Sequence, residues 1–294
     1  GNILTPRLNY KWNSSDKKNI FRISAGNGFR VANIFTEDHA ALTGARSVEF
    51  EGELNPEKSW NVNLNFVKKN YFTNGFFLGI DSSAFYTYFN NRILPDYDTD
   101  PNKIIYRNLE GSSLSKGIAL NLNMFWISGL KILAGATLMD VSIKENGERF
   151  RQPLTESFQS TWGISYELTS IGLAIDYTGN LYGPMRLPLL GKLDPRPEYS
   201  PWWSIQNIQL TKTFSNQWEI YGGIKNLLDF TPDSSSIARP YDPFDQNVVF
   251  GNDGQVIPTA ENPYALTFDP SYVYAANQGI RGFIGIRYTL KTRM

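Results

Sequence analysis

The chain has 294 residues, of which 41% are hydrophobic and 14% aromatic, and its 28 basic and 28 acidic residues give a net charge near zero. A neutral chain offers no electrostatic basis for binding nucleic acid. The absence of cysteine excludes disulfides, thiolate nucleophiles and zinc–sulfur sites, and no run approaches the roughly 18–20 apolar residues that a transmembrane helix needs. With one histidine and no phosphate-binding or hydrolase motif, the sequence also predicts that the protein is not an enzyme.

Hydrophobic and polar residues alternate with a period of two along most of the chain, which predicts β-strands. In SWNVNLNF (59–66), for example, Trp60, Val62, Leu64 and Phe66 share one face and asparagines occupy the other. Several segments approach the ~9–11 residues of a tilted membrane strand, whereas strands of soluble sandwiches usually have ~5–6. The predicted strands cover residues 3–13, 19–27, 57–67, 76–90, 114–127, 131–143, 158–168, 171–182, 202–213, 217–228 and 279–290.

The connections between these strands alternate strictly in length. Tight turns are expected at residues 14–18, 68–75, 128–130, 169–170 and 214–216, and long loops at 28–56, 91–113, 144–157, 183–201 and 229–278. This alternation is typical of outer-membrane barrels, which have short periplasmic turns and long outer loops. Tyr and Trp residues near the strand ends fit the aromatic girdles of such barrels. The sequence therefore predicts an all-β fold, a transmembrane antiparallel β-barrel that crosses the outer membrane many times.

The number of strands, eleven, is odd. Bacterial single-chain barrels have even strand numbers, and an open sheet would leave unpaired edges in lipid. We therefore expect residues 1–294 to be one part of a larger barrel, contacting membrane lipid on one face and pairing with another part of that barrel. The chain also lacks an initiator methionine and a signal peptide, so we expect a mature or cut product that begins in an outer loop.

Several local motifs resemble the C-terminal half of the TonB-dependent outer-membrane receptors, in an order that covers nearly the whole chain. The motifs are TPRLNYKW (5–12), FRISAGNGFR (21–30), LNPEKSWNVNLNF (54–66), YRNLEGSSLSKGIALNLN (106–123), YGGIKNLLDFTP (221–232) and RGFIGIRYTL (281–290). The version GNGFRVANIFTEDHAAL (26–42) is most similar to receptors of the Bacteroidetes lineage. The barrel of this family has about twenty-two strands, so the chain would supply about the last eleven.

The resemblance implies active import of a large, scarce nutrient, without chemical conversion. It implies that an absent N-terminal half holds the plug, the TonB box and the contact with TonB–ExbB–ExbD. Metal chelates such as siderophores, haem and cobalamin-type ligands are the leading candidates. Import of a glycan or peptide with a surface lipoprotein is an alternative, as is a passive porin-like channel, and a soluble lectin-like sandwich is a third class.

Two loop features are candidate ligand or metal contacts. In DYDTDPNK (96–103), Asp96, Asp98 and Asp100 alternate as in the first half of an EF-hand, but the glycine and glutamate that complete such a loop are missing. The alternatives are a loose calcium site and a solvated acidic turn. The loop 183–201 places Arg186 and other basic residues among apolar ones, either as a ligand contact or as a scaffold stiffened by proline.

The longest loop, 229–278, is acidic and unusually aromatic, which predicts an ordered outer loop that packs or binds. Its candidate ligand contacts are Tyr241, Phe244, Tyr264 and Tyr272. The acidity favours neutral, flat or partly apolar ligands over a strongly anionic chelate.

The first long loop contains His39, the single histidine of the chain, and begins beside Arg30. In haem-importing relatives an axial histidine lies in this loop, but the motifs that flank it there are not matched by FRVA (29–32) and LNPEKS (54–59). His39 is therefore either a haem or metal ligand or an ordinary exposed histidine. Arg30 is the remaining candidate ligand contact.

Overall fold

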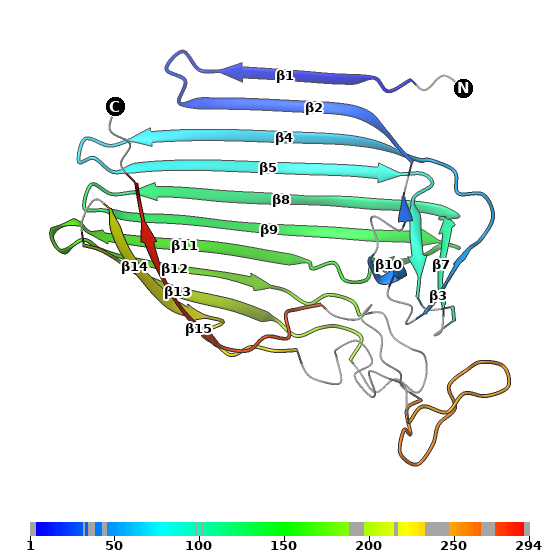
Figure 1. Cartoon of the computed structure of the whole chain (residues 1–294). Coiled ribbons are helices and arrows are strands. Elements are labelled where there is room, and N and C mark those ends of the chain that lie inside the picture. The colour runs from blue at the N-terminus through cyan, green and yellow to red at the C-terminus, as the bar shows by residue number, and fades with distance from the viewer. Residues whose placement is uncertain are drawn as a thin grey trace.

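The computed structural model describes residues 4–31, 33–34, 39–42, 46–97, 99–100, 103–187, 197–214, 217–232, 247–265 and 274–290. Eleven strands of one twelve-stranded antiparallel sheet are each paired with the next along the path β1-β2-β4-β5-β8-β9-β11-β12-β13-β14-β15. Figure 1 shows this main sheet curving from β1 (blue) to β15 (red). Among the described residues, no helix is long and apolar enough to cross a membrane.

The main sheet confirms the predicted strands. Their bounds are β1 Arg7–Asn13, β2 Asn19–Arg30, β4 Glu57–Tyr71, β5 Phe77–Phe89, β8 Gly111–Phe125, β9 Leu130–Glu145, β11 Phe158–Leu168, β12 Leu173–Tyr182, β13 Trp203–Thr213, β14 Trp218–Lys225 and β15 Arg281–Tyr288. The path ends at β1 and β15, and neither pairs with a second main-sheet strand in the part of the chain that the structure describes. The barrel is therefore open.

The two faces of the main sheet differ as the alternation predicts. On β4, Trp60, Val62 and Leu64 are 54%, 40% and 39% exposed, and on β15, Ile284 and Ile286 are 82% and 65% exposed. The successive strand pairs from β4 to β15 place these side chains on one face, because directly opposed residues share a side of the sheet. The opposite face is mainly polar, with Asn61, Asn63 and Asn65 along β4. An apolar outer face and a polar inner face are the arrangement of a membrane barrel around an aqueous lumen.

The short connections all lie at one end of the main sheet and the long ones at the other (Figure 1). Among the described residues, the short ones are tight turns. Gly129, between β8 and β9, has a φ of 90°, and a Cβ there would lie 2.8 Å from the carbonyl oxygen of Glu167. Such a turn requires glycine. A 3-10 turn, η2 (Thr169–Ile171), joins β11 to β12.

The long connections contain short strands that the sequence analysis does not predict. Three short strands, β3 (Ser47–Phe50), β6 (Ile93–Asp96) and β7 (Lys103–Asn108), form a second sheet in the order β3-β7-β6. β3 runs parallel to β7, although the two strands come from different loops. A fourth short strand, β10 (Glu148–Arg151), extends the main sheet by pairing with β9.

The second sheet and the 3-10 turn η1 (His39–Leu42) form a unit that we call the cap. It has its own hydrophobic core, in which Ile104 and Tyr106 are fully buried. The other members of this core are Ile34, Ala41, Ile93 and Tyr97. Burial of these side chains explains why four-residue strands are stable here, since each strand alone would bury too little apolar surface.

Candidate functional site

The cap lies at the long-loop end of the main sheet, beside the ends of β5, β8 and β9 (Figure 1). A buried cation helps to hold it together. The guanidinium of Arg46, which is 3% exposed, donates to the carbonyl oxygens of Tyr97 at 3.0 Å and Lys103 at 3.3 Å, and it lies 5.5 Å from the centroid of the Tyr97 ring. At the surface of the cap, an ion pair of 2.8 Å joins Lys103 to Glu49 and raises the pKa of the lysine.

A buried carboxylate fastens the cap to the rim of the main sheet. Glu57, at the start of β4, is 2% exposed, and it accepts from the Arg30 Nε at 2.7 Å and from the backbone N–H of Ile93 at 2.9 Å. Ile93 is the first residue of β6, so this hydrogen bond ties the cap to β4. Burial lowers the pKa of the neighbouring Arg92, and the negative charge of Glu57 opposes that shift.

Three asparagines close the same junction. Asn108 accepts from the backbone N–H of Asn55 at 2.7 Å and donates to the carbonyl oxygens of Asn55 and Asn91 at 2.9 and 3.0 Å. Asn91 donates to the carbonyl oxygen of Pro56 at 2.9 Å and accepts from the backbone N–H of Lys58 at 3.1 Å. These bonds satisfy backbone groups at the points where the chain leaves and re-enters the main sheet.

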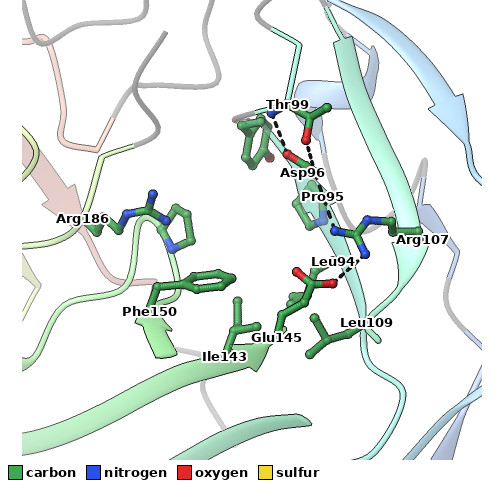
Figure 2. A pocket seen from close by; sticks show the side chains of 12 residues that line it. Leu94, Pro95, Asp96, Thr99, Arg107, Leu109, Ile143, Glu145, Phe150 and Arg186 are labelled. Atoms are coloured by element: carbon green, nitrogen blue, oxygen red, sulfur yellow. Dashed lines mark hydrogen bonds and ion pairs between the residues drawn. The ribbon is translucent and has the colours of Figure 1, made fainter. Parts of the chain in front are cut away.

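A pocket of about 260 Å³ opens between the cap and the main sheet (Figure 2). Its apolar wall includes Leu94, Leu109, Ile143 and Phe150. Its charged groups are Asp96, Arg107, Glu145 and Arg186. We call this the cap pocket. Cations and anions balance in it, so it suits a ligand that offers hydrogen bonds and an apolar surface more than one of high net charge.

Arg107 is the centre of the charged network on the cap side of the pocket. Its guanidinium is 2.6 Å from a carboxylate oxygen of Glu145 and 3.8 Å from one of Asp96, and Glu51 is 3.6 Å away. The hydrogen bond to Glu145 raises the pKa of Arg107 above its usual value. Asp96 also accepts from the N–H and hydroxyl of Thr99, at 3.0 and 2.7 Å.

Arg186 lies on the other side of the cap pocket. Its guanidinium carbon is 5.7 Å from the centroid of the Phe150 ring, within the range of a cation–π contact. A carboxylate oxygen of Glu198 is 3.8 Å away. Figure 2 shows Arg186 and Phe150 facing Asp96 and Arg107 across the pocket. Two predicted site residues from different loops, Asp96 and Arg186, therefore line one cavity.

The other predicted site residues that the structure describes are Arg30, Asp100 and Tyr264. Arg30 is engaged with Glu57 at the rim, Asp100 is 3.9 Å from the Lys103 Nζ, and Tyr264 is 48% exposed. His39 begins η1, and its side chain lies outside the described part of the chain. Asp98, Tyr241, Phe244 and Tyr272 also lie outside the described residues.

The structure does not test the predicted calcium site. Within the described ranges no three His, Cys, Asp or Glu side chains come together in a way that could hold a metal ion. One of the three candidate aspartates, Asp98, is not described, and the other two have basic neighbours in Arg107 and Lys103. The calcium site stays a prediction.

Another buried asparagine closes the base of the longest loop. Asn226, which is 2% exposed, donates to the carbonyl oxygens of Phe230 and Gln278 and accepts from the N–H of Phe230. Asp229 accepts from the N–H of Ile280 at 2.6 Å. Sequence reasoning did not single out Asn226, Glu57 or Asn108, although each lies in a motif that suggested the family.

Comparison with known proteins agrees with this architecture. Residues 1–227 match a family model described as TonB dependent receptor-like, beta-barrel. No curated protein sequence matches the chain. The solved structures with similar folds include the ferric-catecholate import receptor Fiu from Escherichia coli K12, with a TM-score of 0.64 and 12% identity over 98% of this chain.

Two further similar structures are the siderophore receptor PiuA from Acinetobacter baumannii and the FrpB iron transporter from Neisseria meningitidis. PiuA has a TM-score of 0.59 and 12% identity over 96% of this chain, and FrpB has 0.60 and 9% over 97%. The chain spans 35% of the length of Fiu and of PiuA and 39% of FrpB. Because the family model matches most of the sequence and the fold agrees, the chain belongs to the TonB-dependent receptor-like β-barrel family of the outer membrane.

Proposed function

We propose that the complete receptor imports a scarce nutrient across the outer membrane with energy coupled through TonB, and that this chain supplies part of the barrel wall and the cap pocket. The main observation in support is the cap at the long-loop end, because the pocket beside it lies where a ligand from outside the cell would arrive. TonB–ExbB–ExbD would act through an N-terminal part of the receptor. The family membership supports this role.

The inner face of the main sheet supports a transport role. Arg22 donates to the side-chain oxygen of Asn65 at 2.7 Å, and Asn65 donates to the carboxylate of Asp81 at 2.6 Å. These side chains lie on the face opposite the apolar one. Arg22 is directly opposite Asn65, Asn65 is directly opposite Ser83, and Asp81 is two residues from Ser83 on the same face of β5. A hydrogen-bonded polar wall allows water and a polar ligand to pass through the lumen.

The ligand class that fits best is an organic metal chelate of low net charge, such as a siderophore complex. The cap pocket offers the Arg186 and Phe150 pair for a flat group, and Arg107, Glu145 and Asp96 for hydrogen bonds. The structural neighbours include a ferric-catecholate import receptor, a siderophore receptor and an iron transporter. Haem and cobalamin-type chelates are the next candidates.

The test is uptake by cells that carry the full-length receptor. Iron-limited cells with and without the receptor gene would receive radiolabelled ferric catecholate, ferric hydroxamate, haem, cobalamin or a maltooligosaccharide. We expect receptor-dependent uptake of one of the chelates, abolished by a protonophore and by loss of TonB. Uptake that persists with the protonophore would indicate a passive channel, and uptake of the oligosaccharide alone would indicate glycan import.

A variant of the cap pocket then tests where the ligand binds. Arg107→Gln removes the charge that organises Glu145 and Asp96, so we expect the half-saturating chelate concentration to rise roughly tenfold, at about 1.4 kcal/mol per tenfold change. Arg287→Gln is the matched control, since it also breaks a 2.6 Å arginine–carboxylate pair, with Glu219, at the short-turn end. If the two variants change the half-saturating chelate concentration equally, the ligand does not bind in the cap pocket.

A further inference from the structure

Three asparagines in this chain are directly followed by glycine, in the pairs Asn27–Gly28, Asn74–Gly75 and Asn146–Gly147. Asparagine is a thermolabile residue, and a glycine after it leaves the backbone nitrogen open to the asparagine amide, because glycine has no Cβ. The structure places the three pairs in different settings. The first lies within a strand, the second in a turn at the short-turn end, and the third at the tip of a hairpin.

Asn146 and Gly147 form the whole turn between β9 and β10, since Glu145 is paired with Glu148. Their φ angles are 50° and 84°. A two-residue hairpin loop with positive φ at both positions is a type I′ turn, which asparagine and glycine adopt at low cost. Both residues are exposed, and apart from its chain neighbours no atom lies within 4 Å of where a Cβ of Gly147 would be. The turn is therefore open to water and uncrowded.

The peptide group between Asn146 and Gly147 makes no hydrogen bond to any residue that the structure describes, and neither does the Asn146 side chain. This peptide group can therefore rotate without breaking a hydrogen bond. The rotation converts a type I′ turn into a type II′ turn, in which Asn146 keeps a φ of about +60° and takes a ψ of about −120°. At that ψ the Gly147 nitrogen is eclipsed with the Cβ of Asn146, so it comes close to the side-chain carbonyl carbon.

Hydrogen bonds hold the second pair in place. The Gly75 N–H donates to the carbonyl oxygen of Phe72 at 3.1 Å, and the side-chain oxygen of Asn74 accepts from the Phe76 N–H at 3.1 Å. Both bonds must break before the Gly75 nitrogen can approach the Asn74 amide. At about 0.5–1.5 kcal/mol for each bond, the same rotation should be roughly tenfold rarer at Asn74 than at Asn146.

The first pair is held by the main sheet. Asn27 and Gly28 lie within β2, where they are paired with Trp60 and Ser59 of β4. The Asn27 N–H also donates to the carbonyl oxygen of Pro6 at 3.0 Å. Rotation of a peptide group here would open the ladder between β2 and β4, and strands paired on both sides open least often. We therefore expect Asn27 to be protected more strongly than Asn74.

We propose that Asn146 is a site of spontaneous deamidation. The Gly147 nitrogen loses its proton and attacks the side-chain carbonyl carbon of Asn146, so that a new C–N bond closes a succinimide ring. The C–N bond of the amide breaks, and its nitrogen leaves with that proton as ammonia. Water then adds to either carbonyl of the ring and opens it, which gives aspartate or isoaspartate. Solvent water is the only co-reactant, and each product adds a negative charge to the turn.

The modification acts on a wall of the cap pocket. Among the described strands β10 pairs only with β9, so its register depends on the turn. Isoaspartate carries the backbone through the former side chain and so adds an atom to that turn. We expect this to weaken the pairing of Phe150 with Ile143, two residues that line the pocket (Figure 2). An effect on uptake would rest on the proposed function, so the test measures the modification and the hairpin directly.

The test follows each asparagine by peptide mass spectrometry while the folded full-length receptor is kept in detergent micelles at neutral and at mildly alkaline pH. We expect Asn146 to convert roughly tenfold faster than Asn74, and Asn27 to convert more slowly still. The rate should rise with pH, because the attacking nitrogen must lose its proton. Equal rates at Asn146 and Asn74 would overturn the proposal. The receptor unfolded in denaturant is the control, and a tenfold difference that persists there would show that the turn does not select Asn146.

Hydrogen exchange of residues 148–151 measures the consequence for β10. In receptor molecules that have formed isoaspartate, these amides should exchange roughly tenfold faster, which corresponds to the loss of about one hydrogen bond. Asn146→Gly is the matched control, since it keeps a residue suited to positive φ and removes the reactive amide. Incubation should leave the exchange of this variant unchanged. If its β10 amides also become faster, or if those of the converted wild-type receptor do not, the proposed effect on the hairpin is wrong.

Discussion

Replacing Glu57 tests whether the buried carboxylate holds the cap to the barrel. Glu57→Ala removes the acceptor of the Ile93 N–H and the partner of Arg30 in one step. Glu57→Gln keeps an oxygen that can accept from Ile93 but removes the charge. The two variants therefore separate the hydrogen bond from the ion pair.

The size of the effect follows from burial. A buried N–H left without an acceptor costs about 1–3 kcal/mol. The Arg30 side chain is 54% exposed, so its ion pair is screened by water and contributes about 0–1 kcal/mol. We expect Glu57→Ala to destabilise the cap by roughly 2 kcal/mol. Glu57→Gln should destabilise it by no more than about 1 kcal/mol, since this variant removes only the screened ion pair with Arg30.

Hydrogen exchange of the full-length receptor measures this local stability. At about 1.4 kcal/mol per tenfold, amides in residues 93–96 and 103–108 should exchange roughly 30-fold faster in Glu57→Ala and up to about fivefold faster in Glu57→Gln. Residues 130–145 of the main sheet should not change. Glu53→Gln, at an exposed carboxylate in the same segment, is the control. Cap exchange in Glu57→Ala within twofold of the wild-type rate would refute the reasoning.

Three further predictions concern the sheet, a turn and the longest loop. Gly117→Ala should lower the unfolding temperature, because a Cβ there would lie 2.5 Å from the carbonyl oxygen of Leu138. Gly163→Ala is the control and should not lower it, because the nearest atom to a Cβ there is 3.9 Å away. Equal unfolding temperatures of the two variants, measured by heat-dependent gel mobility, would contradict this prediction. The hydrogen bond from Ser14 lowers the pKa of Asp16 below its usual value of 3.8. The stability that the Asp16 carboxylate gives to the turn is therefore complete above pH 3.8 and is lost as the pH falls through the lowered pKa. A carboxyl titration by NMR with its midpoint at or above 3.8 would disprove it. Asn226→Ala should increase proteolysis within residues 229–278, while Asn61→Ala, on the inner face, should leave it unchanged; equal cleavage would count against the role of Asn226.

The strands of the main sheet could be predicted from the sequence because each one meets two different environments. Lipid on one side and water on the other impose a period of two over many residues, as in Trp60, Val62 and Leu64. The cap could not be predicted in this way. β3 and β6 have four residues each, and β6 contains Pro95, which usually argues against a strand. Their stability comes from a core assembled by segments of two separate loops, which no local pattern reveals.

The cap pocket shows the same limit at the level of single residues. Asp96 and Arg186 were candidates for separate reasons, an acidic turn and a basic loop, and nothing in the sequence indicated that they line one cavity. Arg107 and Glu145 were not candidates, since each is a single charged residue within a predicted long loop, 91–113 or 144–157. Their 2.6 Å contact depends on how β7 docks on the end of β9. Only the tertiary structure supplies that relation.

The motifs that suggested the family have a physical reason to be recognisable. Glu57 lies in LNPEKS, Asn108 in YRNLEG and Asn226 in IKNLLD. The side chain of each makes hydrogen bonds to backbone groups at a point where a long loop meets the barrel. Apolar positions on the strands can exchange one hydrophobic residue for another, because the lipid face requires only hydrophobicity. A side chain that must both donate and accept at fixed points has few substitutes. The identifiable part of this sequence is therefore the set of polar residues that anchors its loops.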